Sequence, residues 1–599
     1  MKSVFWKTFF AVLLALVVGW ILKLIFWGSV IGVIASSSNA TVPVQDHSVL
    51  VVDMSTFVLD EQTTENFAGA SLLSGGALPT VGILDAIQTI YAAASDPRIS
   101  CIYLRPDGAT AGYAQIEELR AALKYFRDQG KPVVAYTLNP DNAGYYLATV
   151  ADKLYMTSDH GGTSMLVGLG GQMMFLGDIL ERLGVNVQLI RHGKYKFAGE
   201  MFVRNSSSPE NREQNQRMIT SMWESLRAPR AESRGLSQEA RDAMIDGLEL
   251  VQPEDFLEKG LVDALLDKAG VAGKLAVVSG VSGADDLRLI ALQDYVESVR
   301  AVPSKRKNTI AVVFLNGEIV DGAGSSLSLE GGVTGDYFAD LIDAIRIDEK
   351  VKAVVFRVNS PGGSVIASSK IKGAIDRLRA VKPVVASYGD YAASGGYWVS
   401  CSCSPIFSNA TTLTGSIGVF SMIPDVSATA SDLLHVGIET IGSHAHSDMY
   451  SLMRPLDNAE LDYMQKSVED IYDRFVGLVA EGRSMETASV DSIAHGRVWT
   501  GADALGIRLV DHIGTLQDAL AFAMDSAGGP LDLGSWNVVE YPAPLTAMEE
   551  LTILLSPGQT VPTILSGTPF EPLGEAFDGL RIKDPSTVYA LLPYSIKIK

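Results

Sequence analysis

Cysteine is scarce in this sequence, which has only three among its 599 residues: Cys101, Cys401 and Cys403. Three thiols cannot form a disulfide framework, and the Cys-x-Cys pair lacks the second ligand pair of a structural zinc site. We therefore interpret all three as buried core thiols, and we expect no bound metal.

Basic surfaces and phosphate-binding loops are also missing. The net charge is −21, the isoelectric point is near 4.9, and no stripe of lysine and arginine occurs. Nucleic-acid binding needs basic patches that neutralise phosphate, so we expect no nucleic-acid partner. The pattern Gly-x-x-x-x-Gly-Lys followed by Ser or Thr is absent from the sequence. The chain is therefore expected to use no ATP, no ATPase partner and no cofactor.

Hydrophobic residues, by contrast, make up 47% of the chain and form one long run near its start. The run covers residues 9–35, follows Lys2 and Lys7, and predicts one transmembrane helix whose basic end stays in the cytoplasm. Lys23 costs on the order of 2.5 to 3.5 kcal/mol at mid-membrane, so the limits of the span stay open. A cleaved signal peptide is the alternative, but its apolar region has only about 7 to 15 residues. Either way, the residues after 40 are expected on the periplasmic side of a bacterial inner membrane.

The sequence contains an internal duplication. Lys-Pro-Val-Val-Ala at residues 131–135 recurs at residues 382–386, an offset of 251 residues (382 − 131). Around both copies, apolar runs of strand length alternate with segments of helical length. Such alternation predicts parallel strands with crossover helices, so we expect an α/β fold of two tandem domains. The predicted elements are strands 49–52, 99–105 and 133–136 with helices 82–93 and 115–127 in the first copy, and strands 310–315, 353–358 and 384–388 with helices 337–346 and 366–379 in the second.

Four segments follow from the duplication. A polar break at residues 303–308 separates the two copies, and a tail with many prolines and glycines follows the second copy. We expect irregular structure in this tail. The predicted segments are an anchor and linker at residues 1–40, a first α/β repeat at 41–305, a second at 306–540 and a C-terminal extension at 541–599.

One stretch of the second copy, residues 382–399, is typical of a nucleophile site. It predicts a strand that Gly389 and Asp390 break, and then a helix that starts at Ser394. The next residue is Gly395, and free N–H groups beside a serine can stabilise an oxyanion. The alternative is that Ser394 only caps the helix, which is the commonest role of a serine in this position.

The two copies differ where chemistry would take place. At the offset of 251 residues, Ala143 corresponds to Ser394, and Lys196 corresponds to Ser447. A serine in one copy and a lysine in the other suggest one composite site with Lys196 as the general base. To accept a hydroxyl proton, this lysine needs a pKa that burial has lowered by about 3 units.

Neighbouring side chains offer alternatives. Lys194 could take the place of Lys196, and His192 would suggest a serine–histidine enzyme, although no aspartate partner is evident. His444 and His446 could bind a metal, but no third ligand stands at a recognisable spacing. We therefore favour the serine–lysine pair.

Five motifs occur together within about residues 45–530. They are Gly-x-Tyr-Lys-x-Ala at residues 193–198, Ser-Pro-Gly-Gly at 360–363, Ala-Ser-Gly-Gly-Tyr at 393–397, Thr-Gly-Ser-Ile-Gly at 414–418 and Arg-Val-Trp-Thr-Gly at 497–501.

This set of motifs resembles the signal peptide peptidase A (protease IV) family of long, membrane-anchored bacterial proteases. The resemblance implies a Ser–Lys serine peptidase with the Clp/crotonase-like fold. It also implies a bowl-shaped homotetramer, anchored in the inner membrane, that degrades signal peptides after their release. By motif match, Ser394 would be the nucleophile and Lys196 the general base. Ser416 would hydrogen-bond the lysine, and the N–H groups of Gly395 and Gly363 would form the oxyanion hole.

The predicted function is thus an ATP-independent, membrane-bound serine endopeptidase for apolar peptides in extended form. Two other functions stay open. A crotonase-like acyl-CoA hydratase or isomerase would use paired N–H groups on a thioester oxygen, although an extracytoplasmic body makes CoA a poor substrate. A non-catalytic membrane scaffold would use the duplicated body for assembly, although it would need neither Ser394 nor Lys196.

Overall fold

The structure is a computed structural model of the whole chain. It describes residues 18, 19, 23, 42–63, 78–161, 165–235, 237–300, 306, 308–322, 333–531, 533–543 and 588–592. Within these ranges, no helix is both long enough and apolar enough to cross a bilayer. The predicted membrane helix at residues 9–35 lies outside the described residues except at three positions, and so do the predicted segment limits at residues 40 and 305.

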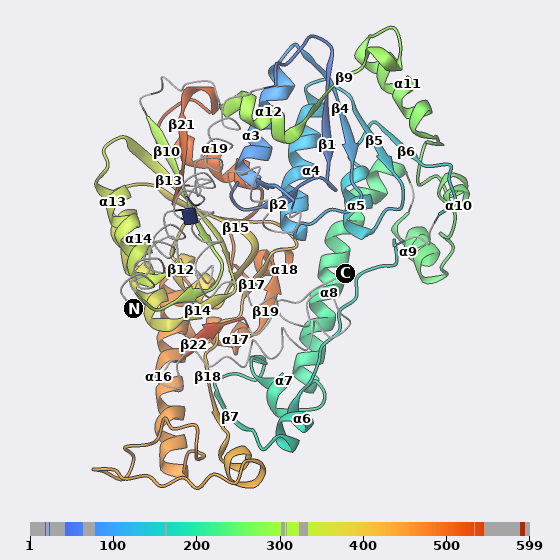
Figure 1. Cartoon of the computed structure of the whole chain (residues 1–599). Coiled ribbons are helices and arrows are strands. Elements are labelled where there is room, and N and C mark those ends of the chain that lie inside the picture. The colour runs from blue at the N-terminus through green and yellow to red at the C-terminus, as the bar shows by residue number, and fades with distance from the viewer. Residues whose placement is uncertain are drawn as a thin grey trace, which may run out of the picture.

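The first repeat is built on a six-stranded sheet whose strands all run parallel (Figure 1). Helices α3, α4 and α12 pack on one face of this sheet, and α11 packs on the other. In sheet order the strands are β8 (Ala264–Leu265), β6 (Lys153–Met156), β5 (Val133–Thr137), β4 (Ile99–Arg105), β1 (Ser48–Asp53) and β9 (Arg288–Ala291). The helices of this repeat are α3 (Ile83–Ser95), α4 (Tyr113–Asp128), α5 (Asn142–Ala148), α6 (Gly177–Arg182), α7 (Glu200–Val203), α8 (Pro209–Arg234), α9 (Gln238–Asp246), α10 (Pro253–Glu258), α11 (Lys268–Ser279) and α12 (Leu292–Arg300).

The second repeat has the same plan. One face of its sheet packs against its own helices, and the other face packs against α3, α4 and α19 in a core that both repeats share. Its strands are β19 (Val498–Thr500), β17 (Leu413–Gly415), β15 (Val384–Ala393), β13 (Val351–Ser360), β10 (Thr309–Asn316) and β21 (Asn537–Tyr541), with β16 (Ile406–Ser408) beside β15 and β20 (His512–Ile513) beside β16. Its helices are α13 (Gly335–Ile347), α14 (Val365–Arg379), α15 (Gly395–Ser400), α16 (Asn458–Arg483), α17 (Thr487–Ile493), α18 (Gly501–Gly506) and α19 (Leu516–Ser526). The expected α/β class with two tandem copies is therefore confirmed.

A third, mixed sheet joins the two repeats. Strand β7 of the first repeat pairs antiparallel with β18 of the second over six residues. A strand from the C-terminal tail, β22, also lies in this sheet, so the tail is not wholly irregular. In sheet order the strands are β12 (Val333–Thr334), β11 (Ile319–Val320), β14 (Gly362–Ser364), β22 (Tyr589–Leu591), β18 (Phe420–Asp425) and β7 (Asn186–Arg191); the short strands β2 (Val58–Asp60) and β3 (Thr80–Gly82) pair separately.

Strand β15 does not break where the sequence predicted a turn. It continues through Gly389 and Asp390 to Ala393, because its later residues gain a new neighbour in β17. The register of the pairing with β13 shifts after Tyr388 and resumes at Ala392, so Gly389 and Asp390 stay in the strand without a paired residue in β13. The Asp390 carboxylate accepts a bond from the Ala114 N–H of α4 at 2.9 Å, so the predicted turn is instead a contact between the repeats.

The correspondence between the copies shifts by one residue near the predicted nucleophile. The hydroxyl of Tyr145 donates to Leu261 O at 2.9 Å, and the hydroxyl of Tyr397 donates to Leu509 O at 2.8 Å. The donor tyrosines of these equivalent bonds give an offset of 252 residues (397 − 145). Asn142, and not Ala143, therefore corresponds to Ser394, although the first copy still has no serine there. Downstream the offset of 251 residues predicts that residues 185–190, which include most of β7, correspond to residues 436–441. The repeat is lost there, because residues 436–441 form no strand.

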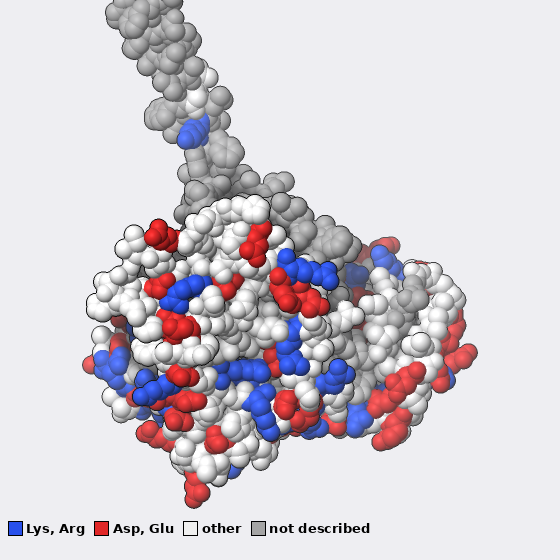
Figure 2. Space-filling model, turned by 90° about the horizontal axis from the view of Figure 1, so that it is seen from below, with Lys and Arg blue, Asp and Glu red and all other residues white. Residues whose placement is uncertain are grey.

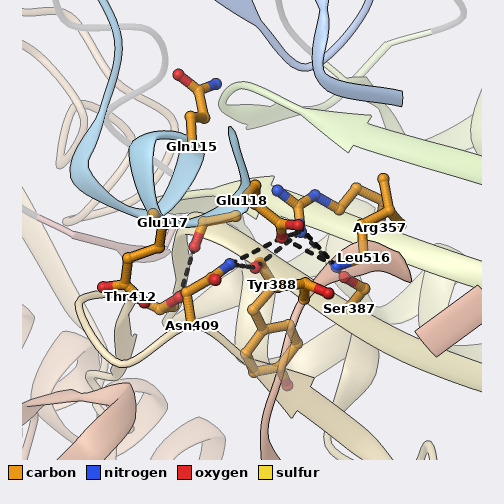
Figure 3. Close-up of polar contacts among 12 residues, drawn as sticks. Gln115, Glu117, Glu118, Arg357, Ser387, Tyr388, Asn409, Thr412 and Leu516 are labelled. Carbon is orange, nitrogen blue, oxygen red and sulfur yellow. Dashed lines mark hydrogen bonds and ion pairs between the residues drawn. The ribbon is translucent and has the colours of Figure 1, made fainter. Parts of the chain in front are cut away.

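A buried ionic network holds the two repeats together (Figure 3). Arg357 of β13 donates to Glu61 Oε2 at 2.8 Å and to Glu118 Oε1 of α4 at 3.0 Å. All three side chains are fully buried. Glu118 also accepts from the side-chain amide of Asn409 at 2.9 Å and from the Leu516 N–H. Removing one partner would leave buried charge without compensation.

The outer surface carries charges of both signs. On the face that Figure 2 shows, acidic and basic side chains are interspersed over the described part of the body, with no field of one sign. The three cysteines are buried and unpaired, as predicted. Burial raises the pKa of the Cys401 thiol to about 11, which makes it a poor nucleophile.

We expect Arg357→Met to lower the free energy of unfolding by about 3 to 5 kcal/mol, because it leaves the carboxylates of Glu61 and Glu118 buried without their cation. Urea unfolding followed by tryptophan fluorescence measures this change. Arg377→Met is the matched control, since Arg377 pairs with Asp343 at the surface and its loss should cost less than about 1 kcal/mol. Equal effects of the two substitutions would contradict the prediction.

Candidate active site

Ser394 stands at the junction of β15 and α15, with a backbone φ of 54°. A positive φ is unfavourable for a residue other than glycine, and such strain is often found at functional positions. The main chain is held there by bonds from Ser394 N–H to Gly415 O and from Trp398 N–H to Ser394 O, both at 2.8 Å. The hydroxyl makes no bond to the start of α15, so Ser394 takes the N-cap position without capping the helix.

Lys196 reaches this serine from the first repeat. It follows β7, which the pairing with β18 holds against the second repeat. Its Nζ donates to Ser394 Oγ at 2.8 Å, to Ser416 Oγ at 3.0 Å and to the Ser416 carbonyl at 3.3 Å. The structure thus brings together three residues that the sequence singled out, although Ser394 and Lys196 are 198 positions apart.

The amine of Lys196 is fully buried, and the three oxygens around it are all uncharged. Burial alone lowers the pKa of Lys196 from 10.5 to about 7. A large share of the amine is therefore neutral near neutral pH, and a neutral amine can accept a proton from a serine hydroxyl.

Residues that the sequence analysis did not single out make room for the lysine. A Cβ atom on Gly496 would lie 2.5 Å from the Lys196 Cβ, and one on Gly418 would lie 3.3 Å from the Lys196 Cδ. Arg191 donates to the Lys196 carbonyl at 2.7 Å and forms an ion pair with Glu200 at 3.2 Å. Gly418 lies within one of the quoted motifs, whereas the roles of Arg191 and Gly496 depend on contacts that no spacing indicates.

The two predicted oxyanion glycines lie close to Ser394. Gly395 is the first residue of α15, so its N–H has no acceptor within that helix. Gly363 lies in β14 with a φ of 156°, and a Cβ atom there would lie 1.8 Å from the Ile319 carbonyl oxygen. A Cβ atom on the preceding Gly362 would lie 2.5 Å from Gly395 N, so the two glycine segments are in close contact. Only glycine permits this approach.

The histidine alternatives have other partners. The ring of His192 stacks on Tyr472, with centroids 3.8 Å apart. His446 lies beside Asp457 and Glu460, a set of oxygen and nitrogen atoms that could hold a metal ion, but His444 is not part of it. Arg454 already pairs with Glu460 at 2.7 Å, and a guanidinium in this position opposes a second cation.

A cavity of about 300 Å³ lies in the first repeat, away from Ser394 and Lys196. Its lining includes Leu138, Asn139, Met156, Thr157 and Phe256. The lining also includes Asp159, but the Thr157 hydroxyl accepts a bond from the Asp159 backbone N–H at 3.1 Å, so this bond does not activate it as a nucleophile.

Comparison with known proteins agrees with a peptidase. The model of peptidase family S49 matches residues 125–282 and 376–528, once in each repeat. Protease 4 of Salmonella typhi is 36% identical over 507 residues, which cover 82% of this chain and 80% of that protein. Protease 4 of Haemophilus influenzae is 31% identical over 520 residues, covering 84% and 83%. The putative signal peptide peptidase SppA of Enterococcus faecium is 35% identical over 233 residues, covering 39% and 66%. The chain therefore belongs to peptidase family S49 and is a serine peptidase.

Proposed function

We propose that this chain is a membrane-anchored, ATP-independent endopeptidase that uses Ser394 and Lys196 to degrade cleaved signal peptides and other apolar peptides. The observation that carries the proposal is the 2.8 Å contact between Lys196 Nζ and Ser394 Oγ at a fully buried position. The Clp/crotonase-like fold, the single inner-membrane span and the periplasmic position of the body rest on the sequence motifs and the apolar run at residues 9–35. The name of the Enterococcus faecium relative supports signal peptides as substrates.

The reaction follows from the positions of these groups. Neutral Lys196 takes the hydroxyl proton while Ser394 Oγ attacks the scissile carbonyl carbon. The N–H groups of Gly363 and Gly395 stabilise the oxyanion of the tetrahedral intermediate. The lysine ammonium then gives its proton to the leaving amine, and a water molecule activated by the same lysine hydrolyses the acyl-enzyme. Ser416 accepts a bond from Nζ and so keeps the amine directed at Ser394.

The homotetramer that the family resemblance implies is supported by a contact within the chain. The start of α4 docks on the second repeat, where the Ala114 N–H donates to Asp390 at 2.9 Å. Glu117 of the same helix accepts from the N–H groups of Ala410 and Thr411 at 3.0 Å each. The first repeat thus presents a helix end, and the second repeat presents a surface that receives it.

The equivalent surface of the first repeat is open. Asn139 and Thr157 hold the positions of Asp390 and Asn409, and both line the cavity of about 300 Å³. The helix that corresponds to α4 is α14 in the second repeat, where Ile366 is 59% exposed. We propose that α14 of a second copy docks on this open surface. Docking of α4 within each chain then alternates with docking of α14 between chains. Such head-to-tail contacts form a closed ring when the rotation between copies closes, as a homotetramer requires.

The proposed catalytic pair predicts that Ser394→Ala and Lys196→Met each lower kcat/KM for a fluorogenic apolar peptide by about 10⁴-fold or more. The reason is that Ser394 carries the attacking oxygen and Lys196 carries the amine that accepts its proton. A fluorophosphonate probe should label Ser394 in the wild type and leave Ser394→Ala unlabelled.

The matched control for the lysine is Lys194→Met. Lys194 is exposed and stands over the Tyr195 ring, and it should be dispensable for activity. Circular dichroism and thermal unfolding test whether each variant keeps its fold. Activity close to that of the wild type in either dyad variant, with no labelling of Ser394, would contradict the proposed pair and favour an acyl-CoA enzyme or a scaffold.

The pKa of Lys196 near 7 predicts the pH dependence of the reaction. The neutral amine is the active form, so kcat/KM should be near its plateau above about pH 8 and should fall about tenfold per pH unit below about pH 6. Initial rates in buffers from pH 5 to 9 measure this profile, with circular dichroism at each pH as a control for folding. A rate that stays flat from pH 5 to 9 would exclude a lysine base with this pKa.

The proposed ring predicts that Ile366→Arg shifts the full-length chain in detergent from tetramers to smaller species, because it puts a charge into the apolar contact between copies. Sedimentation velocity measures the distribution of species. Val381→Arg serves as the control, since Val381 is similarly exposed (62%) but follows the far end of α14. Unchanged tetramers in Ile366→Arg would show that this surface is not the interface.

A further inference from the structure

Lys196 lies in a short segment between β7 and α7 that belongs to no helix or strand. Gly193, with a φ of 98°, turns the chain here, and the Lys196 N–H donates to the Gly193 carbonyl at 3.2 Å. The lysine side chain is nevertheless completely buried, with its amine directed at Ser394. Since no ladder of hydrogen bonds fixes the backbone of this turn, other contacts must hold the lysine in position.

An ion pair closes the segment that carries the lysine. Arg191 is the last residue of β7, and Glu200 is the first residue of α7. Both Nη atoms of Arg191 donate to Glu200 Oε1 at 3.2 Å, across a separation of nine positions. The same guanidinium donates through Nη1 to the Lys196 carbonyl at 2.7 Å. Arg191 therefore joins the two ends of the segment and also binds the main chain of the lysine.

Glu200 is itself fixed in place and is only 1% exposed. Its Oε2 accepts from the Ser208 N–H at 3.3 Å, from the Ser208 hydroxyl at 3.1 Å and from the Asn211 side-chain amide at 3.1 Å. Burial alone would raise the pKa of Glu200, but these hydrogen bonds and the charge of Arg191 lower it, so the carboxylate stays ionised. Arg191 cannot turn away to solvent without leaving this buried charge unpaired.

Helix α8 connects this ion pair to the second repeat. The donors to Glu200 lie at the start of the helix. Further along, the Gln214 side chain accepts from the Val498 N–H at 2.7 Å. The carbonyl of the neighbouring Arg497 accepts from the Ser416 N–H at 2.7 Å. The turn of the lysine and the main chain of the serine that binds its amine are thus held by the same helix.

We propose that Arg191 and Glu200 are positioning residues of this peptidase, which fix the turn that directs the Lys196 amine at Ser394 and keep water away from that amine. Arg191 binds the carbonyl of the lysine, whereas the amine binds Ser394 and Ser416. Neither proposed residue contacts the reacting atoms, so both act through the main chain of Lys196. This inference rests on the proposed role of Lys196 as the general base.

Loss of the ion pair changes the state of the amine. Burial is what lowers the pKa of Lys196 to about 7. When the turn loosens, water reaches the amine and the pKa returns toward its ordinary value. The pH dependence of kcat/KM reports the ionisable groups of the free enzyme, so the midpoint of the profile moves to higher pH. A role limited to stability would instead lower the rate equally at every pH.

The other ionisable groups near the turn have partners of their own. The Tyr195 hydroxyl donates to Glu213 at 2.9 Å, and Arg497 stacks on the Tyr195 ring and pairs with Glu213 at 2.9 Å. Burial lowers the pKa of His192 below 6.5, so this histidine titrates below the midpoint expected for Lys196. A rise of the midpoint in a variant therefore reports the lysine.

The experiment measures kcat/KM for a fluorogenic apolar peptide from pH 6 to 10 in the wild type, in Arg191→Met and in Glu200→Gln. We expect both variants to raise the midpoint by about 1 to 2 pH units. The rate at pH 7 should then fall about 5- to 50-fold, because the neutral fraction of the Lys196 amine falls by this factor, whereas the rate at pH 9.5 should stay within about twofold of the wild type.

Glu200→Gln separates positioning from a direct effect of charge. It leaves the charge of Arg191 uncompensated near Lys196, and a nearby positive charge by itself lowers the pKa of a lysine and moves the midpoint down. A lower midpoint in Glu200→Gln would overturn the proposal. So would an unchanged midpoint in both variants with a uniform loss of rate.

Arg191→Lys keeps one charged donor but not the paired geometry of the guanidinium, so it should raise the midpoint less than Arg191→Met does. It carries the test together with Glu200→Gln if Arg191→Met does not fold, which circular dichroism and thermal unfolding decide.

Arg227→Met is the matched control. The Arg227 side chain on α8 is 29% exposed, as against 28% for Arg191, and it pairs with Asp242 at 2.8 Å. Its midpoint should equal that of the wild type, and an equal rise in this control would overturn the proposal. A wild-type profile without a midpoint near 7 would overturn the proposed role of Lys196. A midpoint near 7 that no variant of Arg191 or Glu200 moves would overturn only the positioning role.

Discussion

The fixed contact between the two repeats is the constraint on which the rest of the structure depends. Lys196 belongs to the first repeat and Ser394 to the second, so their 2.8 Å bond exists only while the repeats keep one relative position. Two links maintain it: the buried network around Arg357, and the ladder between β7 and β18. A buried ion pair adds little net stability, but breaking it is costly. Such a network suits a contact that must form in one geometry only.

The same contact accounts for the lowered pKa that the proposed role of Lys196 as a base requires. A pKa lowered from 10.5 to about 7 corresponds to roughly 5 kcal/mol of disfavoured charge. A flexible loop would escape this cost by turning the amine to solvent. Lys196 cannot, because β7 is paired with β18 and because Gly496 and Gly418 leave a channel that its side chain fills. The stability of the shared core therefore maintains the lowered pKa on which the proposed role of Lys196 depends.

Much of this arrangement could be predicted from the sequence, because the duplication permits a comparison of positions within one chain. The limits of β4 were predicted to the residue, and the serine and lysine were predicted as one composite site. The comparison was wrong where the copies differ in length. Between Lys131 and Tyr145 the first copy has one residue fewer than the second copy has between Lys382 and Tyr397. This difference shifts the match of Ser394 from Ala143 to Asn142. It also failed at Asp390, whose acceptor role depends on a helix 276 positions away in the chain. Strand β22 has no counterpart in the first copy, so no internal comparison could reveal it.

The dimensions of the site limit what it can accept. Gly362, Gly363 and Gly395 pack so closely that a single added carbon atom would meet a backbone atom at 3.0 Å or less. Such a site recognises main-chain groups, and a chain can present them only in extended form, as β22 does between β14 and β18. A folded protein keeps its backbone groups paired within its own sheets and helices, so it cannot offer a free strand. Released signal peptides and other unfolded apolar segments can. The sheet geometry therefore supports the proposed preference for unfolded substrates, for which no ATP-driven unfolding step would be needed.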